Sequence, residues 1–162
     1  MMANAYTQTK LQHLTEYVVK ALNTRVLDNN IDAWQENAKI VINGDDRGHG
    51  IRIAEWQYNA VLSIEGYPHH LLDPRYLLAA VACWISEFDT ERADLELQDP
   101  TLAIDILDDD TVDVTIELEL SEPIEMIPDD AGLIHYQGMQ YRVQTVPVDT
   151  AEEAEISHAT DG

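Results

Sequence analysis

Apolar residues recur every three or four positions in two segments of the chain, which is the pattern of an amphipathic helix. In residues 7–27 the recurring positions are Leu11, Leu14, Val18, Leu22 and Val26. The second segment opens with Asp73-Pro74, a capping carboxylate followed by the proline that favours a first helical turn, and continues through Leu77, Leu78, Val81, Trp84, Ile85 and Phe88. Because it is apolar over most of its circumference, we expect it to be the buried helix of the domain, with Cys83 packed inside as a small hydrophobe.

Two other segments alternate strictly between apolar and polar residues, which indicates strands with one buried face. The apolar series are Trp56, Tyr58, Ala60, Leu62 and Ile64 in residues 51–64, and Val112, Val114, Ile116, Leu118 and Leu120 in residues 112–120. Ile51 and Ile53 have the opposite parity to the first series. A β-bulge near Ala54 is therefore expected.

Weaker patterns complete the predicted elements. Short strands are expected at residues 37–43 and 102–106, and a small hairpin is expected around Gln137-Gly138. Residues 44–50 predict a polar, glycine-rich loop, and residues 108–110 predict a turn.

The order of these elements predicts an α+β fold. We expect a mixed or antiparallel sheet of about four to six strands, with two main helices packed on one of its faces. Residues 1–148 are assigned to a single domain, and residues 149–162 have the composition of an acidic, disordered C-terminal tail.

The charge of the chain is strongly negative and unevenly spread. The 162 residues contain 31 acidic residues against nine Lys and Arg, a net charge of −22. Residues 87–130 alone carry 17 acids and one arginine, a net of −16. Capture of nucleic acid through its phosphates, including sequence-specific binding, is therefore not expected.

No run approaches the ~18 apolar residues of a membrane span, and a single cysteine allows no internal disulfide, which fits a reducing compartment.

The residues that could carry catalysis or bind a metal ion form no convincing site. Asp108-Asp109-Asp110 lacks the alternating ligands, the glycine and the final glutamate of a calcium loop. The adjacent His69-His70 point in different directions and have no third ligand at helical spacing. Gly48-His49-Gly50 lacks the lysine and the strand-to-helix context of a phosphate loop. We therefore expect a protein that is not an enzyme and that needs no cofactor.

The most informative surface is an acidic sheet face. If the even positions of residues 112–120 are buried, then Asp113, Glu117 and Glu119 share the outer face with Asp105 of the paired strand. Like charges across strands oppose folding by up to about 1 kcal/mol per pair. A solvated face is the commonest fate of such a run. The other interpretations are a high-salt host, a basic partner, or a surface that repels DNA, such as the wall of a channel.

One segment resembles a known family. Residues 105–122, Asp-Ile-Leu-Asp-Asp-Asp-Thr-Val-Asp-Val-Thr-Ile-Glu-Leu-Glu-Leu-Ser-Glu, are similar to the "ILDNDTVDLSIxLxLTE" segment of the phage tail completion protein R family. The aromatic strand at residues 56–64 and the helix at 76–85, which ends in Trp84-Ile85, match more loosely and in the same order. Residues 86–90 and Pro123 depart from the family pattern, so the chain resembles a diverged member.

The resemblance implies a structural virion component of contractile-tailed temperate phages, with a fold like that of tail terminators. Such a protein would complete the tail at its head-proximal end and join it to the neck, as a ring that is expected to be a homo-hexamer. Its partners would be itself and the tube, sheath and neck proteins, with no membrane. It would pass through the host cytoplasm during assembly.

Two sets of residues become candidates for contacts on this interpretation. The acids that would face the lumen or a partner are Asp105, Asp113, Glu117 and Glu119. The candidate subunit-contact loop is Gly44, Asp45, Asp46, Arg47, Gly48, His49 and Gly50. The alternative function is that of an acidic DNA mimic that inhibits a nuclease or restriction enzyme.

Overall fold

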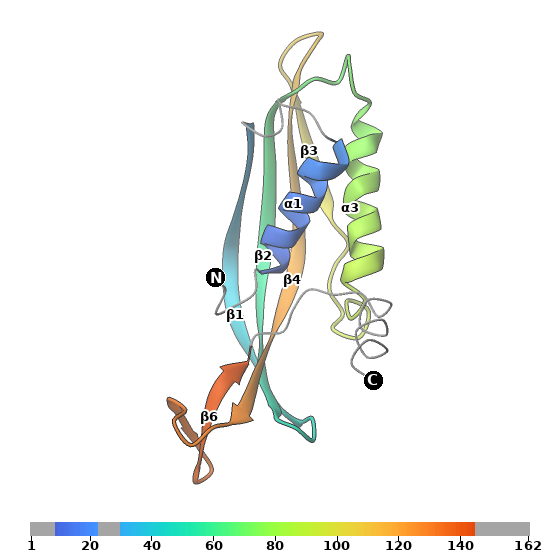
Figure 1. The fold of residues 1–162 in the computed structure, drawn as a ribbon. Helices are drawn as coiled ribbons and strands as arrows, with labels where there is room; N and C mark the ends of the chain where they lie inside the picture. Colours follow the sequence, from blue (N-terminus) through green and yellow to red (C-terminus); the bar gives the residue numbers. More distant parts are fainter. Residues whose placement is uncertain (1–8, 23–29, 145–162) are drawn as a thin grey trace.

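The computed structural model describes residues 9–22 and 30–144, which form two labelled helices and one six-stranded sheet (Figure 1). The helices are α1 (Lys10–Leu22) and α3 (Pro74–Phe88). The strands are β1 (Ile31–Asp46), β2 (Ile51–Tyr67), β3 (Thr101–Ile106), β4 (Val112–Pro128), β5 (Ile134–Tyr136) and β6 (Met139–Gln144). The acidic tail predicted for 149–162, and both ends of the first predicted helix, lie outside the described residues.

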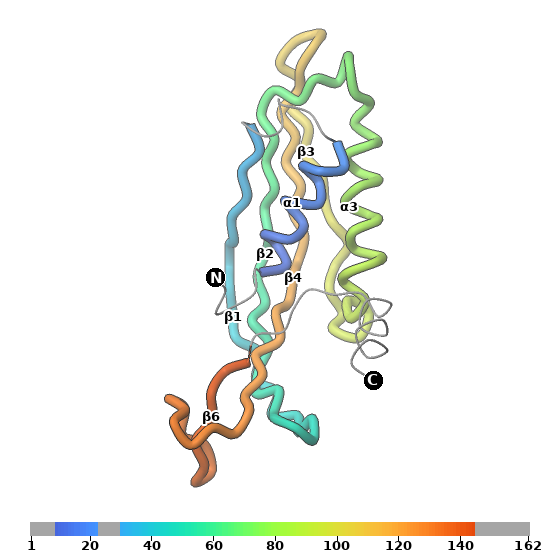
Figure 2. The backbone as a smooth tube through the Cα atoms, viewed as in Figure 1, coloured from blue at the N-terminus to red at the C-terminus, as the bar shows by residue number. Residues whose placement is uncertain are grey.

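The sheet is antiparallel throughout, in the order β1-β2-β4-β6-β5, with β3 also paired to β4. β3 covers residues 112–117 of β4, and β6 pairs farther along with residues 125–128. Figure 2 shows β1, β2 and β4 running along the length of an elongated molecule, with both helices beside the same part of the sheet. The α+β prediction is confirmed.

The core lies between the helices and the even-numbered positions of β2 and β4, as the alternation predicted. Leu11, Leu14 and Val18 of α1 join Leu77, Val81 and Trp84 of α3 on one side of it. The sheet contributes Tyr58, Ala60, Leu62, Ile64, Val112, Val114, Ile116, Leu118 and Leu120, all of them buried. Complete burial of one such aliphatic side chain is worth about 1.5–3 kcal/mol, so this layer is the main apolar contribution to folding.

The long strands are longer than predicted. The residues beyond the predicted limits do not alternate between apolar and polar, so the sequence pattern did not indicate them. β1 begins at Ile31 rather than residue 37, and most of it is exposed, so no buried face marks it in the sequence. Its pairing with β2 shifts register twice, once between Ile42 and Asp45. Gly44, whose φ is 77°, lies in this bulge. Gly44–Asp46 therefore belong to the strand, which corrects the prediction of a loop that begins at residue 44.

Two other predicted backbone features are confirmed. The register between β2 and β4 shifts between Arg52 and Ala54, as expected for a bulge there. Gln137 and Gly138 have φ angles of 51° and 80° and join β5 to β6, which is the pattern of a two-residue hairpin turn.

Helix α3 starts as predicted but is buried on one side only. The Asp73 carboxylate accepts the backbone N–H of Arg75 at 2.9 Å and so caps the helix. Trp84 is fully buried, and its Nε1 donates to Nδ1 of His13 on α1 at 2.8 Å. On the opposite side Tyr76 is 63% exposed and Cys83 is also exposed. The helix expected to be the buried one of the domain is therefore buried on one face alone, and the prediction that Cys83 is buried was wrong because Cys83 lies on the uncovered side.

Candidate functional site

The predicted acids lie together on the face of the sheet that points away from the helices. Asp105 of β3 is the direct cross-strand partner of Asp113 of β4, and Thr101 is paired with Glu117. Glu119 follows on the same face of β4, beyond the end of β3. The register inferred from the sequence is thus present, with two carboxylates opposite each other at the start of β4.

The four acids differ in what holds them. Oδ1 of Asp113 accepts the backbone N–H of Gly66 at 2.8 Å, and Oε1 of Glu119 accepts that of Gln98 at 2.6 Å. Both therefore help to anchor neighbouring segments. Asp105 and Glu117 are exposed. These two are the members of the set best placed to meet solvent or a partner.

The β1–β2 turn lies at the other end of the sheet. The backbone N–H of Arg47 donates to the carbonyl of Gly50 at 2.7 Å, and that of Gly48 donates to the Asp46 carboxylate at 2.8 Å. A Cβ at Gly50 would lie 2.4 Å from the carbonyl oxygen of Met126, so this turn sits tightly against β4. At about 3.3 Å per residue, the strand from Ile51 to Gly66 separates the turn from the Asp113 region by roughly 50 Å. The structure does not bring the two predicted sets together.

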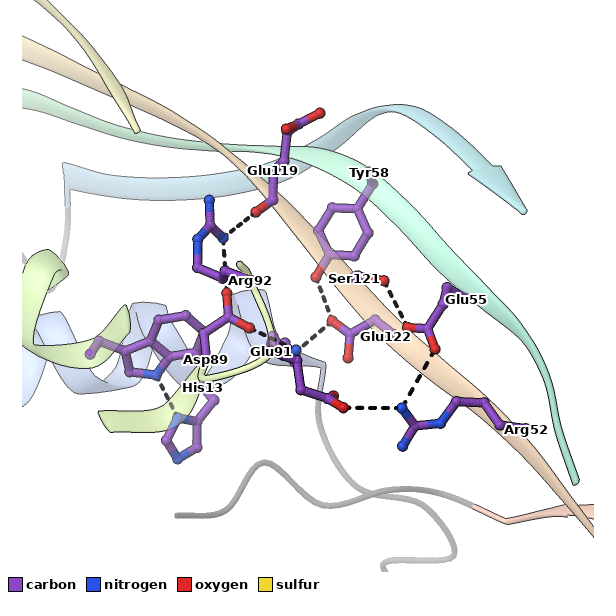
Figure 3. A network of polar contacts seen from close by, with 12 residues as sticks. His13, Arg52, Glu55, Tyr58, Asp89, Glu91, Arg92, Glu119, Ser121 and Glu122 are labelled. Atoms are coloured by element: carbon purple, nitrogen blue, oxygen red, sulfur yellow. Dashed lines mark hydrogen bonds and ion pairs between the residues drawn. The ribbon is translucent and has the colours of Figure 1, made fainter. Parts of the chain in front are cut away.

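A buried polar cluster, which the sequence reasoning missed, joins α1 and the segment after α3 to the sheet (Figure 3). At its centre the Asp89 carboxylate bonds Nζ of Lys10 at 2.8 Å and NH1 of Arg92 at 2.9 Å. The Asp89 side chain is completely buried. Arg92 also donates to the backbone carbonyls of Glu119 and Gln98. This arrangement fixes the path of the chain as it leaves α3.

Glu122 connects this cluster to β2. Its Oε2 accepts the hydroxyl of Tyr58 at 2.6 Å and the backbone N–H of Lys10 at 2.8 Å. Burial raises the pKa of Glu122 above its usual value, in spite of the hydrogen bond from Tyr58 and the bond and charge of Lys10, which lower it. Burial also raises the pKa of Tyr58, and the neighbouring Glu122 carboxylate adds to that shift. A signal was present in the sequence: Glu122 continues the even-numbered, inward-facing series of β4.

A second group of paired charges lies toward the β1–β2 turn. Arg52 contacts Glu125 at 2.9 Å, Glu91 at 3.2 Å and Glu55 at 3.7 Å. Glu55 also accepts the hydroxyl of Ser121 at 2.8 Å. Lys10, Arg52 and Arg92 thus make their polar contacts within these two groups. Because Glu55, Asp89 and Glu125 are buried in the same groups, the strongly negative balance of the exposed surface is left essentially unchanged.

Nothing in this arrangement points to a metal centre or a membrane segment. Within residues 9–22 and 30–144, no three His, Cys, Asp or Glu side chains are grouped so that they could hold a metal ion. In the same part of the chain no helix has the length and apolarity needed to cross a membrane.

Asp108 accepts the backbone N–H groups of Asp110 and Thr111, both at 2.8 Å, and these bonds hold its pKa below the usual value. The triple aspartate is thus the turn that was predicted.

Comparison with known proteins gives the family. A curated relative, described as an uncharacterized 19.2 kDa protein in the rep-hol intergenic region of Haemophilus phage HP1, is 30% identical over 146 residues, which are 90% of this chain and 87% of the relative. No solved structure matches. The family model for the P2 phage tail completion protein R (GpR) matches residues 8–145, a span that contains every helix and strand described above. The chain therefore belongs to the P2 phage tail completion protein R family.

Proposed function

We propose that this protein completes the phage tail at its head-proximal end, where six copies close into a ring that joins the tail to the neck. Membership in the tail completion family implies a role in tail assembly. The observation that carries the finer proposal is that the family match spans the whole described fold rather than one motif. As the family is one of structural tail proteins, the expected partners are other tail proteins, and the mature location is the virion tail.

The acidic face supports a position for the sheet within this ring. Asp105 and Glu117 are exposed on the side opposite the helices, whereas the helical side carries the apolar core. A wall that carries negative charge repels the phosphates of DNA and lets it pass without adhesion. We place the acidic face toward the central passage and the helices toward the outside.

The test is deletion of the gene from the phage that carries it, with the wild-type gene supplied from a plasmid as the control. We expect DNA-filled heads without joined tails, and tails of uncontrolled length, in electron micrographs of the lysate. The plasmid should restore normal particles. Tails of normal length joined to heads in its absence would contradict the proposal.

A second arm tests the position of the acidic face. Glu117→Lys should leave tails complete but reduce DNA delivery, measured as infectious units per DNA-filled particle. Glu87→Lys, at an exposed position of α3, is the matched control and should have little effect. Equal infectivity of the two variants would show that the acidic face does not line the passage.

A further inference from the structure

Two rows of aliphatic residues cross the sheet from one edge to the other on its helix side. Each residue in a row is the direct cross-strand partner of the next. From β1 to β3, the first row is Ile31, Ile64, Val114 and Ile104. The second row, one step along each strand pair, is Ala33, Leu62, Ile116 and Leu102. At these rows β1 and β3 are the two edges of the sheet and lie at the same level along the strands.

The β3 ends of the rows are open. β3 pairs with β4 alone among the described strands, and Leu102 and Ile104 are 43% and 45% exposed. A groove of about 380 Å³ lies beside them, between α3 and β3, and its apolar lining includes Leu78, Val81, Ala82, Ile85, Leu102 and Ile116. An open edge strand with exposed aliphatic side chains is a ready template for another strand.

The β1 ends of the rows have the matching properties. Among the described strands β1 pairs with β2 alone, so its other side is also an edge. Ile31 and Ala33 are half-buried against the core, on the face that carries Leu102 and Ile104. Three successive antiparallel pairings make β1 and β3 of one copy run in opposite directions. The two edges can therefore join as an antiparallel pair without any change of face or level.

We propose that residues 31–34 of β1 in one copy of this chain pair with residues 101–104 of β3 in the next copy, so that both aliphatic rows continue from copy to copy. The inference rests on the proposed ring and names the surfaces that close it. A rotation about an axis along the strands keeps the direction of each strand and the level of each row. Ile31 then lies opposite Ile104, and Ala33 lies opposite Leu102 at the groove beside α3. Such head-to-tail contacts generate rings.

The other face of the sheet fixes the register of this joint. From β1 to β3, the two rows on that face are Asp32, Ser63, Thr115 and Ala103, and Trp34, Val61, Glu117 and Thr101. Continued into the next copy, they put Asp32 opposite Ala103 and Trp34 opposite Thr101, so no carboxylate is directly opposed to another. A shift of two residues would put Asp32 opposite Asp105, and directly opposed like charges destabilise a strand pair.

The helix layer matches the sheet in width. Four strands spaced about 4.8 Å apart span roughly 19 Å. Two helices packed at axial distances of about 8–10 Å span nearly the same width. Both helices lie beside the same part of the sheet, where they cover one face of it (Figure 2). A sheet that continues across the joint can therefore carry a continuous helix layer, in which α3 of one copy is followed by α1 of the next.

The experiment is disulfide cross-linking of the two edges in the full chain. Cys83→Ser removes the single cysteine, and Asp32→Cys and Ala103→Cys are then introduced together at exposed positions. Within one copy these positions are three strand spacings apart, about 14 Å, which is beyond the ~7 Å between Cα atoms that a disulfide can bridge. Mild oxidation should give a ladder of covalent multiples of 18.3 kDa on denaturing gels, and a reducing agent should collapse it to the monomer.

Two controls make the result specific to the proposed register. Lys39→Cys with Ala103→Cys also places one cysteine on each edge, but Lys39 is paired with Gln57, six residues of β2 or about 20 Å from the partner of Asp32. This variant should give no ladder. An equimolar mixture of chains that carry only Asp32→Cys or only Ala103→Cys should give covalent pairs of about twice 18.3 kDa and nothing larger. Circular dichroism checks that every variant is folded.

Three results would overturn the joint. The first is a folded double variant that forms no ladder, and the second is an equal ladder from the Lys39 control. The third is a covalent dimer from Ala103→Cys alone, which would show a two-fold contact of β3 with β3. Light scattering of the wild type in parallel separates this inference from the ring: an assembly without the cross-link would keep the ring and assign its closure to other surfaces. The deletion phenotype tests the tail function independently of both.

Discussion

The two halves of β4 solve the problem of burial in different ways. In residues 112–120 every even position is an aliphatic side chain in the core, and the acids lie on the other face, where Asp105 and Asp113 are opposite each other. In residues 121–128 the strand carries acids that point inward: Glu122 accepts the backbone N–H of Lys10 and the hydroxyl of Tyr58, and Glu125 pairs with Arg52. The first half separates charge from the core, whereas the second half buries charge and neutralises it. The stability of the first half should depend on the volume of its buried side chains. The stability of the second half should depend on keeping each buried carboxylate with its partner.

The largest effect is expected where a paired charge is removed. Asp89→Ala would leave Lys10 and Arg92 without the buried carboxylate that both contact, and breaking such a group costs about 3–5 kcal/mol. Denaturant unfolding of the purified variant measures the change. Asp94→Ala, at an exposed position of the same segment, is the control and should lie within about 0.5 kcal/mol of the wild type. Equal midpoints for the two variants would show that the paired cluster contributes little.

A volume change tests the other half of the strand. Leu120 is completely buried, so Leu120→Ala should lower the free energy of unfolding by about 3 kcal/mol through lost burial and the cavity left behind. Leu120→Met keeps the volume and should cost less than about 1.5 kcal/mol. The same denaturant titration applies, and a small loss for Leu120→Ala would mean that this part of the core collapses around the gap.

These two halves were unequally predictable from the sequence. Strict alternation fixes the face and the register of residues 112–120, because an apolar series with a period of two has one way to be buried. It stops at Ser121-Glu122-Pro123, although the strand continues to Pro128. The contacts of this extension join residues that are distant in sequence: Glu122 accepts the backbone N–H of Lys10, 112 positions away. A contact between residues so far apart leaves no local sequence pattern. The predicted strand therefore ended at residue 120, where the alternation ends.

The same reason explains the errors elsewhere. Apolar residues around most of α3 predicted the buried helix of the domain with Cys83 packed inside, but burial depends on how many layers cover a helix, and Cys83 lies on the uncovered side. β1 has little buried face to produce an alternating signal. The positions of Asp105 and Glu117 were inferred correctly because they follow from the register of β4. Their role at the passage remains a prediction for the phage experiments.

A smaller effect should come from the titration of Glu122. Its pKa is raised in the folded state, chiefly by burial, so the folded chain holds this proton at a pH where the unfolded chain has released it. The contribution of Glu122 to stability is therefore present at low pH and is lost as the pH rises from the unfolded pKa through the folded one. Glu122→Gln keeps an acceptor for Tyr58 and does not titrate. The stability of this variant minus that of the wild type should increase from pH 4 to pH 7, measured by denaturant unfolding at each pH, and a flat difference would contradict the raised pKa.

The smallest effect should be a gain in stability on the acidic face. Asp105→Asn removes one of two carboxylates that lie opposite each other, and relief of such repulsion is worth up to about 1 kcal/mol. The gain should be largest at low ionic strength and should shrink as salt shortens the Debye length to about 10 Å near 0.1 M. Thermal unfolding of the variant over a salt series measures this, with Asp109→Asn in the exposed turn as the control for a general loss of charge. If both variants gain equally, the repulsion belongs to the whole acidic surface. A gain in stability confined to Asp105→Asn would locate the repulsion in the cross-strand pair of Asp105 and Asp113. The first half of β4 would then keep an unfavourable contact on its outer face. The buried acids of the second half avoid such a contact because each has a hydrogen-bonding or charged partner.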